Sequence, residues 1–441
     1  MDFQDFKKIF EKLISNKYIK IGFIINFIFL IPTFISYIIQ LNNPDIGNDF
    51  VVFYKAGKIA LTNINDLYNP ELYPQNFRYL PFTAYIFSLL TLFPEPISFV
   101  CFEIFIFLLN IPTIIIIYYL IFEIYKIDKK YEEYVFLVLT SYLLFAPHLD
   151  NYFMGQINSI VAFLLLLSLY FYELNIYNFN KKNKNVSKYS NIYGGFCLGL
   201  AITFKFYLVF LVPFILIYRG LMNNQKTNKM KGVLKFNIQS FLGLIPIIFA
   251  HIFPILIYPQ LINDFITINL QGFSIEEAIY SISISRLVLH SLLIFNINVS
   301  GTLIMLSIFI PLFLILFYLY YRKWSSQKIL PEIFTIVILF LFLTYLDIWT
   351  HHLPIIAPFL SLFLIRLNGS IESKKDENKI FKNFTNLDYQ QIKYAYILIA
   401  LNLWALVPFL INNFICPDIY ITNFVYSLLL VIIFIKMIIK L

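Results

Sequence analysis

The stretch "IGFIINFIFLIPTFISYII", residues 21–39, decides the fold class of this chain. It is longer than the apolar core of a signal peptide, and no small-residue cleavage site follows it. The basic segment "KKIFEKLISNKYIK", residues 7–20, precedes it. We therefore expect an uncleaved first membrane span, with residues 1–20 on the cytoplasmic side.

The composition extends this prediction to the whole chain. Of the 441 residues, 60% are hydrophobic and only 13% are charged. A soluble fold of this length cannot bury that much apolar surface. The sequence therefore predicts an all-α polytopic membrane protein, with about 12 to 13 spans at roughly 20 residues each. The three cysteines are far apart and form no CxxC pair, so they indicate neither a disulfide framework nor a metal site.

The net charge of +8 comes largely from short loops, which indicates cytoplasmic loops rather than a nucleic-acid-binding surface. Loops rich in Lys and Arg, expected inside, lie at residues 181–188, 219–232, 322–328 and 366–379. Poorly charged breaks, expected outside, lie around Lys205, at 258–300, at Asp347–Pro354 and at 412–418. The orientation of residues 80–155 stays open, because neither "FPEP" (93–96) nor "KIDKKYEEY" (126–134) has a clear charge bias.

These segments suggest one membrane domain over residues 1–441, with no separate soluble unit. Its expected parts are an outer loop at residues 41–79, a helical core at 80–367 and C-terminal helices at 390–441.

The outer loop holds "NDFVVFYKAG", residues 48–57. From Asp49 onward the apolar residues follow helical spacing, which predicts an amphipathic helix at the membrane interface with Asp49 as its N-cap. Such a cap is worth about 1 kcal/mol. Capping alone does not explain the motifs that follow.

Six short motifs occur in a characteristic order. They are the segment headed by Asp49 that ends at Ala56, "DLYNP" (66–70), "FRYLP" (77–81), "GQIN" (155–158), "GLAITFKFYLVFLVPFILIYRG" (199–220) and "WTHHLP" (349–354). In this order they resemble the GT-C superfamily of glycosyltransferases, and most closely glycosyltransferase family 87, the polyprenol-phosphate-mannose-dependent α-mannosyltransferases. The chain departs from that pattern at "KFYL", where the family has Lys-x-x-Pro, and at "YLDIW", where it has Ser-Pro-x-Ser-Trp. These departures concern the donor sugar and the acceptor more than the fold.

The resemblance implies transfer of a hexose, with mannose favoured, from a polyprenyl phosphate to an acceptor hydroxyl on the extracytoplasmic face, with inversion. Such a reaction needs a carboxylate to take the hydroxyl proton, and Asp49 fits that role because partial desolvation makes it more basic. The implied partners are the lipid-linked donor, a glycolipid or glycan acceptor and membrane lipid, without nucleic acid and without a cofactor.

The leaving phosphate calls for a fixed cation. The candidates are Lys205, which interrupts an apolar run, then Arg286 in the outer loop, then Arg78. The alternative for Lys205 is a side chain that snorkels from a helix end.

The remaining candidates for donor or acceptor binding are polar or aromatic. His351 or His352 can contact the phosphate or the acceptor, although a pair of histidines is also common in solvated loops. Gln156 and Asn158 stand at a helix end, where they bind sugar hydroxyls or act as caps. Tyr54 can stack on a sugar or belong to an interfacial aromatic belt. No metal is expected, because two adjacent histidines lack further ligands at suitable spacing.

Three other functions stay open. A transporter or lipid flippase would use Asp49 and Lys205 in a substrate pathway. A polymerase or ligase acting on polyprenyl-diphosphate glycans would have a larger late outer loop. A family member that has lost activity would explain the altered motifs.

Overall fold

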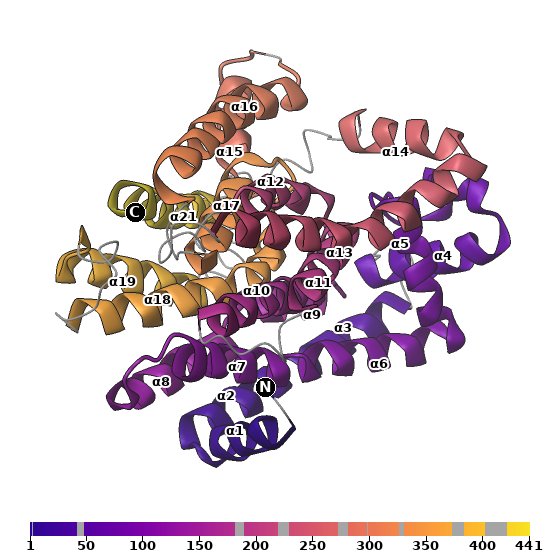
Figure 1. Ribbon diagram of the computed structural model, residues 1–441. Coiled ribbons are helices and arrows are strands. Elements are labelled where there is room, and N and C mark those ends of the chain that lie inside the picture. Colours follow the sequence, from indigo (N-terminus) through magenta and orange to yellow (C-terminus); the bar gives the residue numbers. More distant parts are fainter. Residues whose placement is uncertain are drawn as a thin grey trace.

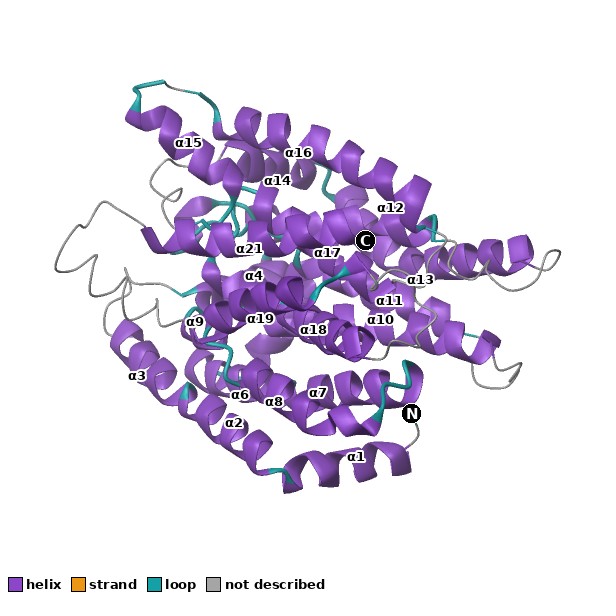
Figure 2. Ribbon diagram, turned by 90° about the vertical axis from the view of Figure 1, so that its left-hand side faces the viewer, coloured by secondary structure: helices purple, strands orange, loops and turns teal. Residues whose placement is uncertain are grey.

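The computed structural model describes residues 1, 3–41, 48–180, 189–218, 229–271, 281–297, 299–325, 330–372, 383–401 and 421–441. Helices joined by loops make up this part of the chain, and it contains no strand (Figure 2). The α-helices are α1 (Phe3–Ser15), α2 (Lys17–Ile28), α3 (Leu30–Leu41), α4 (Asp49–Thr62), α5 (Pro81–Phe87), α6 (Glu95–Leu108), α7 (Asn110–Tyr119), α8 (Glu132–Leu143), α9 (Pro147–Phe153), α10 (Asn158–Asn180), α11 (Ser190–Phe204), α12 (Val212–Leu216), α13 (Lys229–Ile257), α14 (Gln260–Gln271), α15 (Ile284–Ile294), α16 (Gly301–Leu319), α17 (Leu330–Thr344), α18 (Ala357–Glu372), α19 (Asn386–Leu401) and α21 (Ile421–Lys440). Shorter 3₁₀ or π turns are η1 (Ile64–Asp66), η2 (Pro70–Leu72), η3 (Ser88–Leu92), η4 (Leu120–Ile124), η5 (Lys129–Tyr131), η6 (Phe206–Leu211), η9 (Tyr320–Trp324) and η10 (Thr350–Ile355).

Five helical stretches in the described part of the chain are long and apolar enough to cross a membrane. They are Lys17–Leu41, Glu95–Ile124, Asn158–Tyr177, Leu234–Ile257 and Gly301–Trp324. The first contains the apolar run at residues 21–39, and together they confirm an all-α polytopic membrane protein. Shorter apolar helices, α11 and α17 among them, are also present, and the count of about 12 to 13 spans stays a prediction.

The core of the bundle is built from α10, α17 and α18. Every residue of α17 is buried, as is most of α18, whereas α2 and α3 expose large apolar side chains. In Figure 2, α1, α2 and α3 form a row along one edge of the molecule. The apolar residues of α17 therefore face protein on all sides, and those of α2 and α3 are available to lipid.

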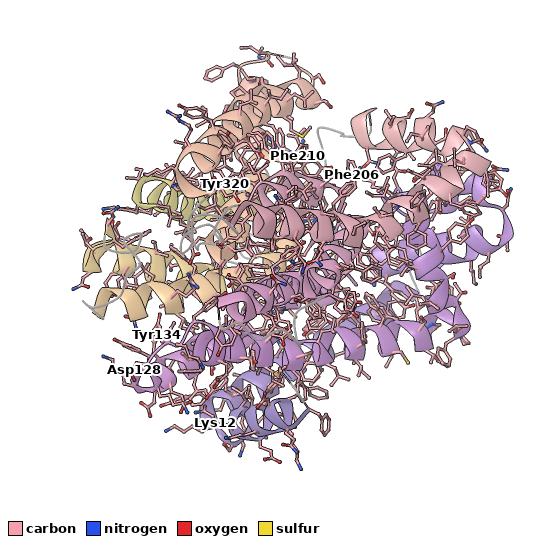
Figure 3. All side chains as sticks on the ribbon, viewed as in Figure 1. Lys12, Asp128, Tyr134, Phe206, Phe210 and Tyr320 are labelled. Carbon is pink, nitrogen blue, oxygen red and sulfur yellow. The ribbon has the colours of Figure 1, made fainter. Side chains whose placement is uncertain are left out.

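Two tight turns settle the relative orientation that the sequence left open. The Tyr54 hydroxyl donates to the Phe93 carbonyl at 3.0 Å, which places the "FPEP" turn beside α4. Lys12 contacts Glu132 at 2.5 Å, which places the start of α8 beside α1, and Figure 3 shows Lys12 and Asp128 in this same region. The two turns thus lie at opposite ends of the Glu95–Ile124 span.

The helix that leads to Lys205 packs closely on α13 (Figure 1). A Cβ at Gly195 would lie 2.0 Å from the Ser240 carbonyl oxygen, and one at Gly243 would lie 2.1 Å from the Ile192 carbonyl oxygen. Only glycine permits this approach of the two backbones. α11 is about 22 Å long at 1.5 Å per residue, too short to span a bilayer alone. Its end is therefore a break within the membrane domain, as the interrupted apolar run predicts.

Some predicted loops differ from the structure. Arg366, expected to open a basic loop, lies inside α18, where the Glu332 carboxylate compensates its charge. The predicted loop at 181–188 and the predicted outer turn at 412–418 lie outside the described residues, as do parts of the loops at 219–232, 322–328 and 366–379.

The Arg366–Glu332 pair predicts a large stability effect. Arg366 Nε donates to Glu332 Oε1 at 2.8 Å, and both side chains are buried. Arg366→Met leaves an uncompensated buried carboxylate and is expected to lower the free energy of unfolding by about 3 kcal/mol. The double variant Arg366→Met/Glu332→Leu is expected to recover most of this loss. Melting temperatures in detergent check both results, and a double variant no more stable than the single one would contradict the account.

Candidate functional site

The start of α4 leaves the Asp49 carboxylate out of the capping role. The N-cap is Asn48, whose side chain accepts a hydrogen bond from Val51 N at 3.2 Å. The prediction that Asp49 is the N-cap is therefore wrong. Asn and Asp are equally good caps, and the asparagine that comes first takes the position. Asp49 becomes the first helical residue, with its carboxylate available for other contacts.

The Asp49 carboxylate is held by the turn between α9 and α10. Asp49 N donates to the Met154 carbonyl at 3.0 Å, and Gln156 Nε2 donates to Asp49 Oδ2. Burial raises the pKa of Asp49 to about 6, against the Gln156 hydrogen bond and the positive charge of Lys205, which both lower it. Asp49 is thus a carboxylate with the basicity of a general base near neutral pH.

Gly155 allows this turn to reach α4. Its φ is +64°, and a Cβ there would lie 2.7 Å from the Phe50 Cβ. Gly155→Ala is expected to cost about 2 kcal/mol of stability through backbone strain and overpacking, and to displace Asp49 from Gln156. Gly369→Ala is the matched control, because its Cβ would meet Ile127 at an ordinary 3.5 Å. Melting temperatures of the two variants check this prediction, and equal melting temperatures would contradict it.

Lys205 stands between α11 and η6, in neither helix, with an extended backbone (φ −141°, ψ 92°). Its Nζ lies 3.0 Å from His352 Nε2, 3.5 Å from the Tyr79 hydroxyl and 5.5 Å from the centre of the Tyr79 ring. Burial lowers the pKa of Lys205 to about 8, although the carboxylates of Asp49 and Asp347 raise it. Lys205 is therefore a buried cation that lies close enough to Asp49 for the two charges to act on each other.

The protonation of His352 follows from its two neighbours. His352 Nδ1 accepts from the Trp349 backbone N–H at 3.0 Å, so the neutral ring carries its proton on Nε2. Burial and the neighbouring Lys205 charge lower the pKa of His352 well below its ordinary value. An Nε2–H directed at Lys205 forms a hydrogen bond only with a neutral amine. A charged Lys205 needs an anion beside it, and the His352 Nε2–H can donate to that same anion.

Asn158 contacts the histidine pair, and the two histidine rings lie close together. Asn158, the first residue of α10, donates from Nδ2 to the His351 carbonyl at 2.8 Å. The rings of His351 and His352 are 4.5 Å apart, and those of Trp349 and His351 are 5.5 Å apart. Asn158 thus supports the backbone that presents His352 to Lys205, and its binding of sugar hydroxyls stays a prediction.

Arg78 has a carboxylate partner that the sequence analysis did not identify. Its Nη1 lies 3.2 Å from Asp347 Oδ2, and the side chains are 19% and 25% exposed. Tyr79, also missed as a site residue, follows directly in the chain. Tyr79 stands in the motif "FRYLP", and Asp347 stands in "YLDIW", where the chain departs from the family pattern. A contact between residues 78 and 347 has no local sequence signal.

Arg286 and Tyr54 have surroundings that differ from the expected ones. Arg286, predicted in a loop, is buried in the first turn of α15, with Ser283 as the helix cap. Its neighbour Ser285 donates to the Thr344 carbonyl at 2.6 Å, so this turn lies beside the end of α17. Tyr54 is buried and uses its hydroxyl to bond Phe93. Its contacts are those of a packing residue of α4.

Among the described residues, no group of three or more His, Cys, Asp or Glu side chains lies close enough to hold a metal ion. The ionisable groups gathered here are two carboxylates, Asp49 and Asp347, two cations, Lys205 and Arg78, and the neutral histidines. Such a site can bind an anion and accept a proton.

No curated protein matches the chain. The family model for glycosyltransferase family 87 matches residues 77–345, more than half of the chain. The match includes Arg78, Gln156, Lys205 and Arg286, whereas Asp49 and the histidine pair flank it. This multi-pass membrane protein therefore belongs to glycosyltransferase family 87.

Proposed function

We propose that this glycosyltransferase moves a hexose from a polyprenyl-phosphate donor to an acceptor hydroxyl on the extracytoplasmic face, with inversion at the anomeric carbon. The observation that carries the proposal is that a basic carboxylate, Asp49, lies close enough to a buried cation, Lys205, for each charge to shift the pKa of the other group. Mannose is the favoured sugar because of the motif resemblance.

In this mechanism the acceptor oxygen forms a bond to the anomeric carbon as the bond from that carbon to the phosphate oxygen breaks. The acceptor proton passes to Asp49, whose position is held by Gln156. The electron pair of the broken bond leaves on the polyprenyl phosphate. Lys205 and the Nε2–H of His352 stabilise the charge that develops there, in a buried position where such interactions are strong.

Family membership favours this transferase over the transporter or flippase alternative. The geometry favours it as well, because a general base and a phosphate-binding cation are the two groups that glycosyl transfer from a lipid monophosphate requires. A monophosphate leaving group carries less charge than the diphosphate of a nucleotide sugar, so one buried lysine assisted by a histidine suffices to balance it.

The proposal is tested by sugar transfer in membranes that contain the chain, supplied with radiolabelled polyprenyl-phosphate mannose, polyprenyl-phosphate glucose or the matching nucleotide sugars. The membranes supply the acceptor, and membranes without the chain are the control. We expect labelled sugar to pass from the polyprenyl-phosphate donors to the acceptor, fastest from polyprenyl-phosphate mannose. This transfer should continue when the synthesis of these donors from nucleotide sugars is blocked. Transfer from nucleotide sugars alone, or no transfer above the control, would refute the proposal.

The pH dependence of the reaction follows from the two shifted groups. Asp49 must be deprotonated to act as a base, so kcat/KM is expected to rise as the pH passes about 6. Lys205 must be protonated to bind the phosphate, so kcat/KM is expected to fall as the pH passes about 8. A rate profile from acidic to alkaline pH checks both limbs. Lys205→Arg should remove the alkaline fall, and a profile without an acidic limb would contradict the role of Asp49.

A further inference from the structure

We propose that Asp347 is a specificity-determining residue of this enzyme: its carboxylate, held by Arg78, accepts hydrogen bonds from hydroxyl groups of the donor hexose. This inference rests on the proposed function, because it needs a sugar that lies between Lys205 and Asp49. It adds a residue that stands in "YLDIW", one of the places where this chain departs from the family pattern.

The backbone around Asp347 is anchored on both sides. Asp347 follows closely on the fully buried helix α17. On one side Ser285 Oγ donates to the Thr344 carbonyl at 2.6 Å, and on the other Ile282 N donates to the Ile348 carbonyl at 2.7 Å. These bonds tie the segment to the start of α15, so the carboxylate sits on a fixed part of the backbone. Recognition of a sugar requires such a preorganised acceptor.

Asp347 belongs to the same site as the proposed base and the proposed phosphate ligand. Arg78, which holds Asp347, directly precedes Tyr79 in the chain, and the Tyr79 hydroxyl lies 3.5 Å from Lys205 Nζ. The Asp347 charge also raises the pKa of Asp49 and of Lys205, although burial is the largest cause of both shifts. A donor that places its phosphate at Lys205 and its anomeric carbon within reach of Asp49 carries its hexose between them. A carboxylate close to both groups therefore lies beside that hexose.

The exposure of the Arg78–Asp347 pair fits a ligand contact better than a structural one. Lys205 and His352 are buried, whereas the Asp347 side chain is 25% exposed. Partial access of solvent weakens the contribution of this ion pair to stability. Asp347 contacts Arg78 through Oδ2, which lies 3.2 Å from Nη1. The accessible side of the carboxylate can accept from sugar hydroxyls, for which ionised acceptors are strong partners.

The test compares the hydroxyl preferences of the wild type with those of Asp347→Ala and Asp347→Asn. The donors are the polyprenyl-phosphate hexose that the wild type uses and its analogues that lack one hydroxyl at a time. We expect the wild type to lose at least about 10-fold in kcat/KM with the analogue whose missing hydroxyl contacts Asp347. In Asp347→Ala this analogue and the parent donor should react at nearly the same rate, while the other analogues keep their wild-type ratios.

The result that overturns the inference is an active wild type whose whole pattern of analogue ratios is retained in both variants. Asp347 would then only position Arg78. Asp347→Asn keeps the size of the side chain and serves where the alanine variant does not fold, and it should reduce the same single ratio. A wild type that transfers no sugar from any polyprenyl-phosphate donor overturns the proposed function and this inference together. The two failures are therefore distinguishable.

Discussion

Asp49→Asn is expected to lower kcat by about 10³-fold, the effect of removing a well-placed general base. The asparagine keeps the size of the side chain and can still contact Gln156, which donates to the carboxylate in the wild type. It cannot take the acceptor proton. Because the Asn48 side chain caps α4, the substitution leaves the helix start intact. The loss should therefore appear in kcat, with donor affinity nearly unchanged.

Single-turnover transfer from labelled donor measures this effect, and donor binding to the purified protein separates chemistry from binding. The matched control is Asp66→Asn, an exposed aspartate of η1 in the segment that follows α4, which should behave like the wild type. Equal losses in both variants, or a loss confined to donor binding, would argue against Asp49 as the base.

Lys205→Met is expected to reduce kcat/KM by about 10³-fold, because it removes the buried cation that we propose to face the donor phosphate. Methionine fills the space of the lysine stem, and the Tyr79 ring that contacts the ammonium can pack on it. In contrast to Asp49→Asn, this variant should lose donor affinity together with the rate of transfer. The charge that develops on the leaving phosphate is stabilised by the same group that binds it.

Lys205→Arg keeps the charge but not the geometry, since the larger guanidinium cannot occupy the 3.0 Å contact with His352 Nε2 without displacing the ring. It should regain part of the donor affinity and less of the rate. Lys58→Met, at an exposed lysine of α4 that lies over the Tyr54 ring, is the control. Wild-type binding of the labelled donor by Lys205→Met would exclude Lys205 as the phosphate ligand.

The sequence predicts the fold class well because its signals are local. The apolar run at residues 21–39, the helical spacing after Asp49 and the break at Lys205 each appear in the structure where their patterns place them. The error at the N-cap arises because Asn48 and Asp49 are both good caps, and only the geometry of the first turn selects between them.

The site is less predictable because its contacts join distant segments. Asp49 and Gln156 are 107 residues apart, Lys205 and His352 are 147 apart, and Arg78 and Asp347 are 269 apart. No periodicity records such pairs. Motif order selects several members as candidates but not their partners, so it gives Arg78 without Asp347. The boundary between the outer loop and α15 has no clear motif, so the sequence places Arg286 in the loop and the structure places it in the helix.

The stereochemical outcome of transfer tests the central claim most directly. If Asp49 acts as a general base in a single displacement, a donor of known anomeric configuration yields a product of the opposite configuration, which the anomeric proton and carbon couplings in NMR spectra of the isolated product report. Inversion is the result predicted here. Retention would require a double displacement through a glycosyl-enzyme intermediate or an attack from the side of the leaving group, and would contradict the role assigned to Asp49.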